Sequence, residues 1–316
     1  MHTLVLLGLV GLLAQLVDGS LGMAYGVTST TLLLVIGATP ATASATVHLA
    51  QIGTTLASGA SHWRLGNVDW SVVRRIALPG AVGAFAGATF LSHISTQTAA
   101  PLMSGILLLL GIYIVARFTI WQPRRGQLGK PVRRRFLAPL GVLAGFIDST
   151  GGGGWGPVGT PALLASGRIE PRKVIGSIDS SEFIIAIAAS GGFLVGLGTS
   201  GINFAWAAVL LVGGVIAAPI AAWIVRVIPP RVLGSAVGGV IILSNTRAIL
   251  AGELVTLPGT AQIALYTAIA LVWGAAITWS LRAHLAERRA TAATEGHEPD
   301  PTAAETVQAH DSSTRS

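Results

Sequence analysis

Asp148-Ser149-Thr150-Gly151-Gly152-Gly153-Gly154-Trp155-Gly156-Pro157 is a glycine-rich break inside an otherwise apolar segment that runs from Phe136 to Gly167. An earlier stretch, Asp18-Gly19-Ser20-Leu21-Gly22-Met23-Ala24-Tyr25-Gly26, aligns with it at a constant offset, and no gap is needed from Ala14 to Gly37. Asp18 matches Asp148, Gly22 matches Gly152 and Tyr25 matches Trp155. The sequence therefore contains an internal duplication, and each copy carries a break at the same place.

Such breaks are costly in lipid-facing helices, because hydrocarbon offers no partner for free backbone N–H and C=O groups. Two breaks at corresponding positions of two repeats indicate the substrate site of a transporter, since half-helix N-termini present N–H groups and positive dipole ends to an anion. The alternative is a pair of kinks that allow close helix packing. We expect these substrate-binding residues: Gly19, Ser20, Gly22, Tyr25, Gly26, Ser149, Thr150, Gly152, Gly153, Trp155 and Gly156.

The composition is that of a membrane protein with several spans. Hydrophobic residues make up 52% of the chain and charged residues only 10%, with a mean hydropathy of +0.69; soluble domains have about 25% charged residues. The 20 Lys and Arg residues outnumber the 13 acidic ones. Because the basic residues lie mostly in short loops, they favour loops held at an anionic cytoplasmic leaflet and give no indication of nucleic-acid binding. The absence of cysteine excludes disulfides and cysteine-ligated metals.

The apolar segments predict the domain organisation. Spans are expected near residues 41–63, 76–91, 102–121, 174–198, 203–225, 232–251 and 260–281. The broken segment 2–36 is too long for one span of ~20 residues and too short for two. We expect a first transmembrane repeat at 1–121, a basic cytoplasmic linker at 122–135, a second transmembrane repeat at 136–252, an extra C-terminal span at 258–283 and a polar, disordered tail at 287–316.

Positive charge decides between two topologies. If each broken segment crosses the membrane once, the basic loops 168–173 and 226–231 fall opposite 64–75 and 124–135. If each enters and returns, all four loops and the C-terminal tail face the cytoplasm, as the positive-inside tendency favours. The prediction is an all-α polytopic membrane protein of two homologous repeats. Each repeat has a glycine-broken re-entrant helix pair plus three spans. Because three spans are an odd number of crossings, the second repeat starts on the opposite side of the membrane and the two repeats are inverted.

These motifs resemble the TauE/SafE sulfite-exporter family, a group of bacterial membrane transporters built from two homologous halves. The resemblance covers roughly residues 1–281. It rests on both glycine breaks, on Val47-His48-Leu49-Ala50-Gln51, on Ser58 to Trp63 with Gly66 to Asp69, and on Ala217-Ala218-Pro219. It implies proton-coupled transport of small anions such as sulfite, thiosulfate or sulfoacetate. Some members carry an acidic residue where this chain has Gln51, which puts a coupling role for that position in doubt.

Four polar residues on predicted spans are candidates for proton coupling. Asp179 and Glu182 lie one helical turn apart, and intramembrane carboxylates mark a pathway or a proton relay. Lys173 lies nearby, so an interfacial cap or salt bridge is the alternative. His48 and Gln51 occupy the matching positions of the first repeat. His48 is either a proton carrier or a hydrogen-bonded core residue.

Asp18 and Asp148 are the remaining coupling candidates, and they precede the breaks. A carboxylate there can cap the N–H groups of the following half-helix, with direct proton transfer as the alternative. Carboxylates at an anion site must be protonated, which links proton binding to anion binding. Arg247, well inside a predicted span, pairs either with an acidic group or with substrate. Small residues at matching positions, Gly80 and Gly214 among them, predict close helix packing.

No enzyme motif is present. Gly151 to Pro157 lacks the Lys-Ser/Thr ending of a P-loop, no Gly-x-Ser-x-Gly elbow occurs, and the histidines lack zinc-ligand spacing. We therefore predict a secondary transporter that needs no cofactor or metal and whose partners are a small anionic substrate and the lipid bilayer. The oligomeric state stays open, with a homodimer as one alternative. The competing functions are an anion channel and a non-transporting assembly or sensing module.

Overall fold

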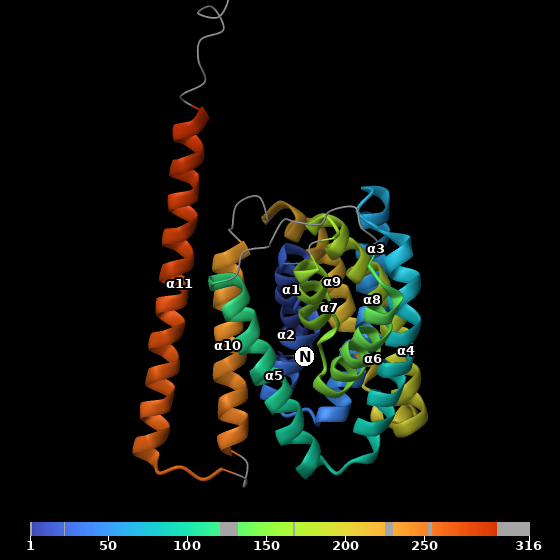
Figure 1. Cartoon of the computed structure of the whole chain (residues 1–316). Coiled ribbons are helices and arrows are strands. Elements are labelled where there is room, and N and C mark those ends of the chain that lie inside the picture. Colours follow the sequence, from blue (N-terminus) through green and yellow to red (C-terminus); the bar gives the residue numbers. More distant parts are fainter. Residues whose placement is uncertain are drawn as a thin grey trace, which may run out of the picture.

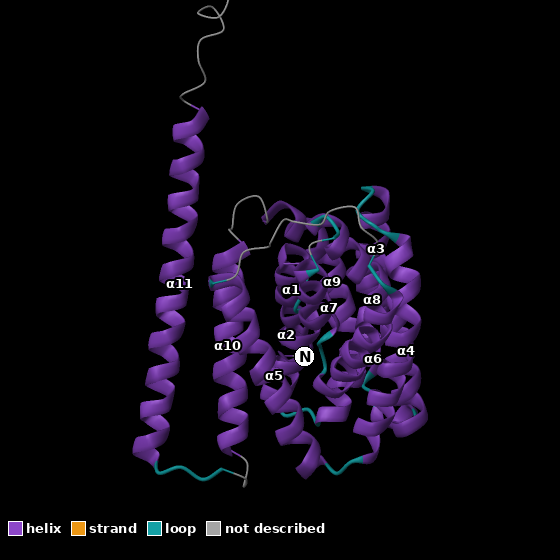
Figure 2. Ribbon diagram, viewed as in Figure 1, coloured by secondary structure: helices purple, strands orange, loops and turns teal. Residues whose placement is uncertain are grey.

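The computed structural model describes residues 2–21, 23–120, 132–166, 168–224, 230–251 and 255–295, and within these ranges its regular structure is helical. Figures 1 and 2 show a bundle with α11 at one edge beside α10. The elements are α1 (His2–Leu21), α2 (Tyr25–Val35), α3 (Pro40–Arg64), α4 (Trp70–His93), α5 (Thr96–Thr119), α6 (Arg134–Gly151), α7 (Trp155–Ala165), α8 (Pro171–Leu197), η1 (Thr199–Gly201), α9 (Phe204–Ile224), α10 (Pro230–Ala251) and α11 (Gly259–Glu295).

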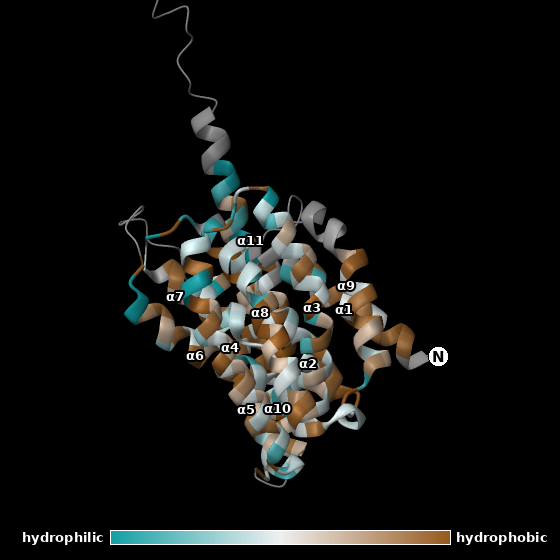
Figure 3. Cartoon of the chain, turned by 90° about the vertical axis from the view of Figure 1, so that its right-hand side faces the viewer, coloured by the Kyte–Doolittle hydropathy of each residue, from teal (hydrophilic) through white to brown (hydrophobic). Residues whose placement is uncertain are grey.

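Five described helices, namely α4, α5, α8, α10 and α11, are long and apolar enough to cross a membrane. Helix α3 has 25 residues, but its polar side chains Ser44, Thr46, His48 and Gln51 lower its hydropathy, and all four are buried inside the bundle. Figure 3 shows hydrophobic residues over most of the bundle and frequent hydrophilic residues at its upper end, from which α11 projects. The chain is a multi-pass membrane protein, as its composition predicts.

Local sequence signals set the helix starts. Pro40 and Pro171 lie in the first turns of α3 and α8, where a missing N–H costs nothing. The Asp69 carboxylate caps α4 by accepting a hydrogen bond of 2.9 Å from the Ser71 N–H. In Figure 1 the loop after α3 lies at the upper end of the bundle, while the α4–α5 and α10–α11 loops lie at the lower end. Successive long helices thus run in opposite directions.

Small residues bring pairs of helices into backbone contact. Helix α4 packs against α6, and a Cβ added at Gly83 would lie only 2.1 Å from the Val142 carbonyl oxygen. Helix α9 packs against α1 in the same manner, since a Cβ at Gly11 would lie 2.4 Å from the Leu210 oxygen. The prediction of close packing through small residues is confirmed. Each broken segment therefore packs against a helix from the other half of the chain.

The C-terminal helix is longer than the sequence pattern predicts. Helix α11 continues to Glu295, so residues 287–295 are helical and not part of a disordered tail. This stretch is rich in alanine, glutamate and arginine, which favour helix, and Glu287 lies 3.2 Å from the Arg231 guanidinium of α10. At 1.5 Å per residue the helix is about 55 Å long and extends beyond a hydrocarbon core of about 30 Å. Residues 296–316 and 121–131, which hold most of the expected tail and linker, lie outside the described residues.

Candidate functional site

Both predicted breaks separate two helices. The first lies between Leu21, the end of α1, and Tyr25, the start of α2, and Ala24 there adopts a left-handed conformation with φ of 99°. The second lies between α6 and α7, where Gly152 and Gly153 have φ values of 68° and 155°. L-residues with a Cβ rarely adopt such angles, which accounts for glycine in the second break.

The two breaks touch each other in the interior. A Cβ added at Gly26 would lie 2.7 Å from the Gly153 Cα, and one added at Gly153 would lie 2.2 Å from the Val27 nitrogen. The Thr30 hydroxyl donates a hydrogen bond to the Gly152 carbonyl, which ties α2 to the second break. Matching segments of the two halves therefore form one structure through backbone contact, with no room for side chains between them.

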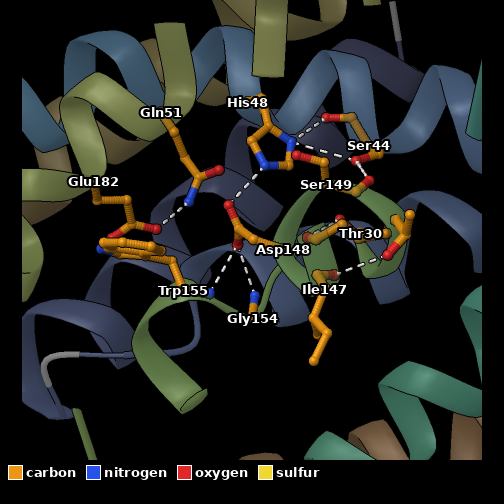
Figure 4. A network of polar contacts seen from close by, with 12 residues as sticks. Thr30, Ser44, His48, Gln51, Ile147, Asp148, Ser149, Gly154, Trp155 and Glu182 are labelled. Carbon is orange, nitrogen blue, oxygen red and sulfur yellow. Dashed lines mark hydrogen bonds and ion pairs between the residues drawn. The ribbon is translucent and has the colours of Figure 1, made fainter. Parts of the chain in front are cut away.

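Two aspartates cap the half-helices that follow the breaks. Asp148 Oδ1 accepts hydrogen bonds from the Gly154 N–H at 2.7 Å and the Trp155 N–H at 2.9 Å, as Figure 4 shows. Asp18 Oδ1 accepts one from the Tyr25 N–H at 3.2 Å. Both carboxylates are buried. The predicted capping role is confirmed, because a carboxylate here satisfies first-turn N–H groups and lies at the positive end of the helix dipole.

Asp148 also contacts His48 of α3 (Figure 4). Its Oδ2 lies 3.0 Å from His48 Nε2, and both side chains are buried. His48 Nδ1 lies 2.8 Å from the Ser44 carbonyl oxygen, which can only accept, so Nδ1 carries a hydrogen. A neutral imidazole then presents an unprotonated Nε2 to Asp148. The contact therefore requires a proton between these two atoms, either on the imidazole or on the carboxyl group.

The matching pair Gln51 and Glu182 meets where α3 packs against α8. Gln51 Nε2 donates a hydrogen bond of 2.8 Å to Glu182 Oε1. Glu182 and Asp18 line a small cavity together with glycines of both breaks, among them Gly26 and Gly153. The cavity holds about 10 Å³, roughly the space for one water.

A second carboxyl group on α8 lies near this cavity. Asp179 interacts electrostatically with Asp18, and Glu182 does so with Asp18, Asp148 and Asp179. Four carboxyl groups thus gather around the two breaks, from α1, α6 and α8.

The two aromatic residues of the breaks pack against glycines instead of lining the cavity. Trp155 is fully buried, its ring lies against Gly80 of α4, and its Nε1 donates hydrogen bonds to the Ile178 carbonyl at 3.0 Å and to Ser181 Oγ at 3.1 Å. Tyr25 lies against Gly214 of α9. Gly80 and Gly214 are the small residues that the predicted duplication pairs, and each contacts the aromatic residue of one break.

The other predicted site residues have varied positions. The Ser149 carbonyl accepts a hydrogen bond of 2.6 Å from Ser44, and the Thr150 hydroxyl donates one of 2.6 Å to the Phe146 carbonyl of its own helix. Gly156 lines the cavity. Gly19 and Ser20 lie in the last turn of α1, and Gly22 lies outside the described residues. Arg247 is exposed on α10 and is not among the residues that line the cavity.

Sequence reasoning missed His62. Its Nε2 lies 3.7 Å from Asp179 Oδ2, and its side chain is 27% exposed whereas that of Asp179 is 7% exposed. The residue sits near the end of α3, beside Arg64, where a histidine is easily assigned to a solvated loop. A usable signal was present, since His62 follows His48 by about four helical turns and thus falls on the same face of α3.

Comparison with known proteins identifies the family. The family described as "Sulfite exporter TauE/SafE" matches residues 7–248. The chain is 50% identical over 282 residues to "Probable membrane transporter protein YtnM" of Bacillus subtilis (strain 168), covering 89% of this chain and 93% of that protein. It is 24% identical over 252 residues to "Probable membrane transporter protein YjnA" of the same organism, covering 76% and 98%. No solved structure matches. The chain belongs to the sulfite exporter TauE/SafE family of membrane transporters.

Proposed function

We propose that this protein is a secondary transporter of small anions, most specifically sulfur-containing oxyanions or sulfonates such as sulfite, thiosulfate or sulfoacetate. The observation that carries the proposal is the meeting of the two breaks at a buried cavity. The first turns of α2 and α7 begin there, and the glycines expose backbone to the cavity. Helix N-termini bind anions through N–H groups and dipoles. The backbone N–H groups of Tyr25 and Trp155 belong to these first turns and donate to Asp18 and Asp148, while the two rings hold the half-helices in place.

Substrate anions compete at this site with carboxylates of the protein. Asp18 and Asp148 already occupy first-turn N–H groups, and Glu182 faces the same cavity. An anion that enters beside ionised carboxylates is repelled, whereas protonation removes that repulsion. We therefore propose that substrate binds together with one or more protons. The cavity has room for only about one water, so anion binding also requires the two breaks to move apart.

We further propose that the chain consists of two inverted repeats, α1–α5 and α6–α10, with α1–α2 and α6–α7 as re-entrant pairs. In support, α4 packs on α6 as α9 packs on α1, and the Trp155–Gly80 contact corresponds to the Tyr25–Gly214 contact. The positive-inside tendency then orients the basic loops toward the cytoplasm of a bacterial cell.

The experiment is pH-driven uptake and counterflow, measured side by side in liposomes with sulfite, thiosulfate and sulfoacetate. Glu182→Gln keeps a group able to hydrogen-bond Gln51 but cannot ionise. We expect it to retain counterflow and to lose its response to an imposed pH gradient. Equal loss of both activities would defeat the coupling role. A wild-type protein that moves none of these anions would favour the alternative of an assembly or sensing module, and transport without saturation or counterflow would favour a channel.

A further inference from the structure

One contact occurs twice in the duplicated core, with different chemistry in each copy. Asp179 matches His48 and Phe193 matches His62, at the same offset in the sequence. His62 of α3 lies against Asp179 of α8, with 3.7 Å between Nε2 and Oδ2. Phe193 of α8 lies against His48 of α3, with ring centroids 6.0 Å apart. Each titratable core position therefore faces an aromatic ring from the opposite helix, an imidazole in one copy and a phenyl ring in the other.

The two rings differ in solvent contact. Phe193 has no exposed surface, and His48 behind it has none either. His62 is 27% exposed, whereas Asp18, Asp148 and Asp179 are all buried. His62 therefore has more contact with solvent than these three aspartates, and it lies near the end of α3. Asp179 Oδ2 is a buried atom without a hydrogen-bond partner among the described residues, so it is free to accept a proton from His62 Nε2.

From this geometry, and on the basis of the proposed function, we infer that His62 passes protons from water to Asp179 and from there to the carboxyl groups at the cavity. Phe193 occupies the matching position at the other end of the bundle, where its ring cannot carry a proton and blocks such a route. The imidazolium of His62 gives its Nε2 proton to the Asp179 carboxylate, which leaves a neutral imidazole and a carboxylic acid. Glu182 lies one turn further along α8 and lines the cavity, so it can receive the proton next. A proton from water restores the imidazolium.

Other groups on the elements packed against α3 do not offer an equivalent route. Asp69 uses its carboxylate to cap α4, and Asp148 is engaged with His48 deeper in the bundle. Helix α9 carries no titratable residue. The remaining titratable or charged groups are Tyr25 on α2, Arg74, Arg75 and His93 on α4, Tyr113 and Arg117 on α5, Arg134 and Arg135 on α6, and Arg172, Lys173 and Glu182 on α8. Asp179 is the described acidic group within ion-pair distance of His62.

The test replaces His62 by the residue of the other copy. In liposomes, His62→Phe should slow pH-driven uptake by about tenfold or more while counterflow persists, because counterflow needs no net proton movement. The pH dependence of the uptake rate should flatten as well. His93→Phe, which removes an exposed histidine at the opposite end of α4, is the matched control and should change neither activity.

Four results separate the inference from the proposed function. Wild-type protein without counterflow for any tested anion defeats the proposed function, and counterflow without a pH response defeats the coupling. If wild-type uptake responds to pH but the His62→Phe variant behaves like the wild type, His62 does not pass protons to Asp179. The same conclusion holds if His62→Phe loses counterflow and pH-driven uptake to the same extent. If His62→Phe does not fold, His62→Gln keeps a polar side chain at this position and carries the same expectation.

Discussion

Removal of the Asp148 carboxylate tests whether this group joins the second break to α3. It accepts two hydrogen bonds from the first turn of α7 and lies 3.0 Å from His48. Loss of one member of a buried pair costs about 3–5 kcal/mol, and loss of a helix cap costs about 0.5–2 kcal/mol. We therefore expect Asp148→Ala to lower the free energy of unfolding by about 4–7 kcal/mol.

Asp148→Asn separates shape from charge. The asparagine oxygen can accept both α7 hydrogen bonds, and its NH₂ group can donate to a neutral His48 Nε2, so the variant mimics the state with the proton on the carboxyl group. The cost should be about 1–2 kcal/mol, the difference between a charged and a neutral hydrogen bond. Asp18→Ala removes a single longer bond to Tyr25 and relieves repulsion with Asp179 and Glu182, so it should cost less than Asp148→Ala.

The assay is thermal unfolding of the purified protein in detergent, with all variants compared in the same buffer. The order of stability should be wild type, Asp148→Asn, then Asp148→Ala, with Asp18→Ala well above Asp148→Ala. Equal destabilisation by Asp148→Asn and Asp148→Ala would refute the shared-proton geometry. If Asp18→Ala lowered the free energy of unfolding as much as Asp148→Ala does, Asp148 would not hold its half-helix more strongly than Asp18 holds the other.

Three further experiments, with four substitutions, test the packing of the breaks and the orientation of the chain. Gly152→Val should abolish liposome uptake, because the residue has φ of 68° and a Cβ would lie 2.4 Å from the Thr30 side chain; normal uptake would place the site elsewhere. Trp155→Phe should lower the free energy of unfolding by about 1 kcal/mol, because the Nε1 hydrogen bonds are lost. It should leave the KM for the anion unchanged, and a raised KM would show that the ring contacts the substrate. Because the chain has no cysteine, Ser200→Cys and Arg168→Cys can be labelled in intact cells; we expect labelling from outside only at position 200, and labelling at 168 would contradict the re-entrant topology.

Local rules predicted most of the helices and the role of the aspartates. The predicted spans near 41–63 and 203–225 agree closely with α3 and α9, because apolar stretches bounded by proline, glycine or charge leave few alternatives. The Asp18 and Asp148 caps follow from the position of a short acidic side chain just before a helix start. The extent of α11 was missed, since its last turns are polar and their helical propensity competes with the expectation of disorder.

Long-range pairing could not be obtained from the sequence. His48 and Asp148 are 100 residues apart, and their contact depends on how α3 and α6 are placed by the packing of other helices. The aromatic residues Tyr25 and Trp155 were expected at the substrate, but the Trp155 ring fills the space that Gly80 leaves, and the Tyr25 ring lies in van der Waals contact with Gly214. A pattern of small residues predicts that helices approach closely without stating which helices do so.

Two sets of polar residues surround the breaks, each drawn from both halves of the chain, and they differ in chemistry: one is the pair His48 and Asp148, the other the acids Asp18, Asp179 and Glu182. The His48–Asp148 pair already needs one proton for its contact, and Asp148 must stay in place to cap α7, so a change of protonation there would disturb the second break. The corresponding residues Asp179 and Asp18 are both acids, and Asp18 makes only one bond to α2. An acid pair can gain a proton and thereby lose its repulsion for an anion, without loss of a strong helix cap. The proposed coupling role therefore suits the cluster of Asp18, Asp179 and Glu182, while the His48–Asp148 pair joins α3 to the second break.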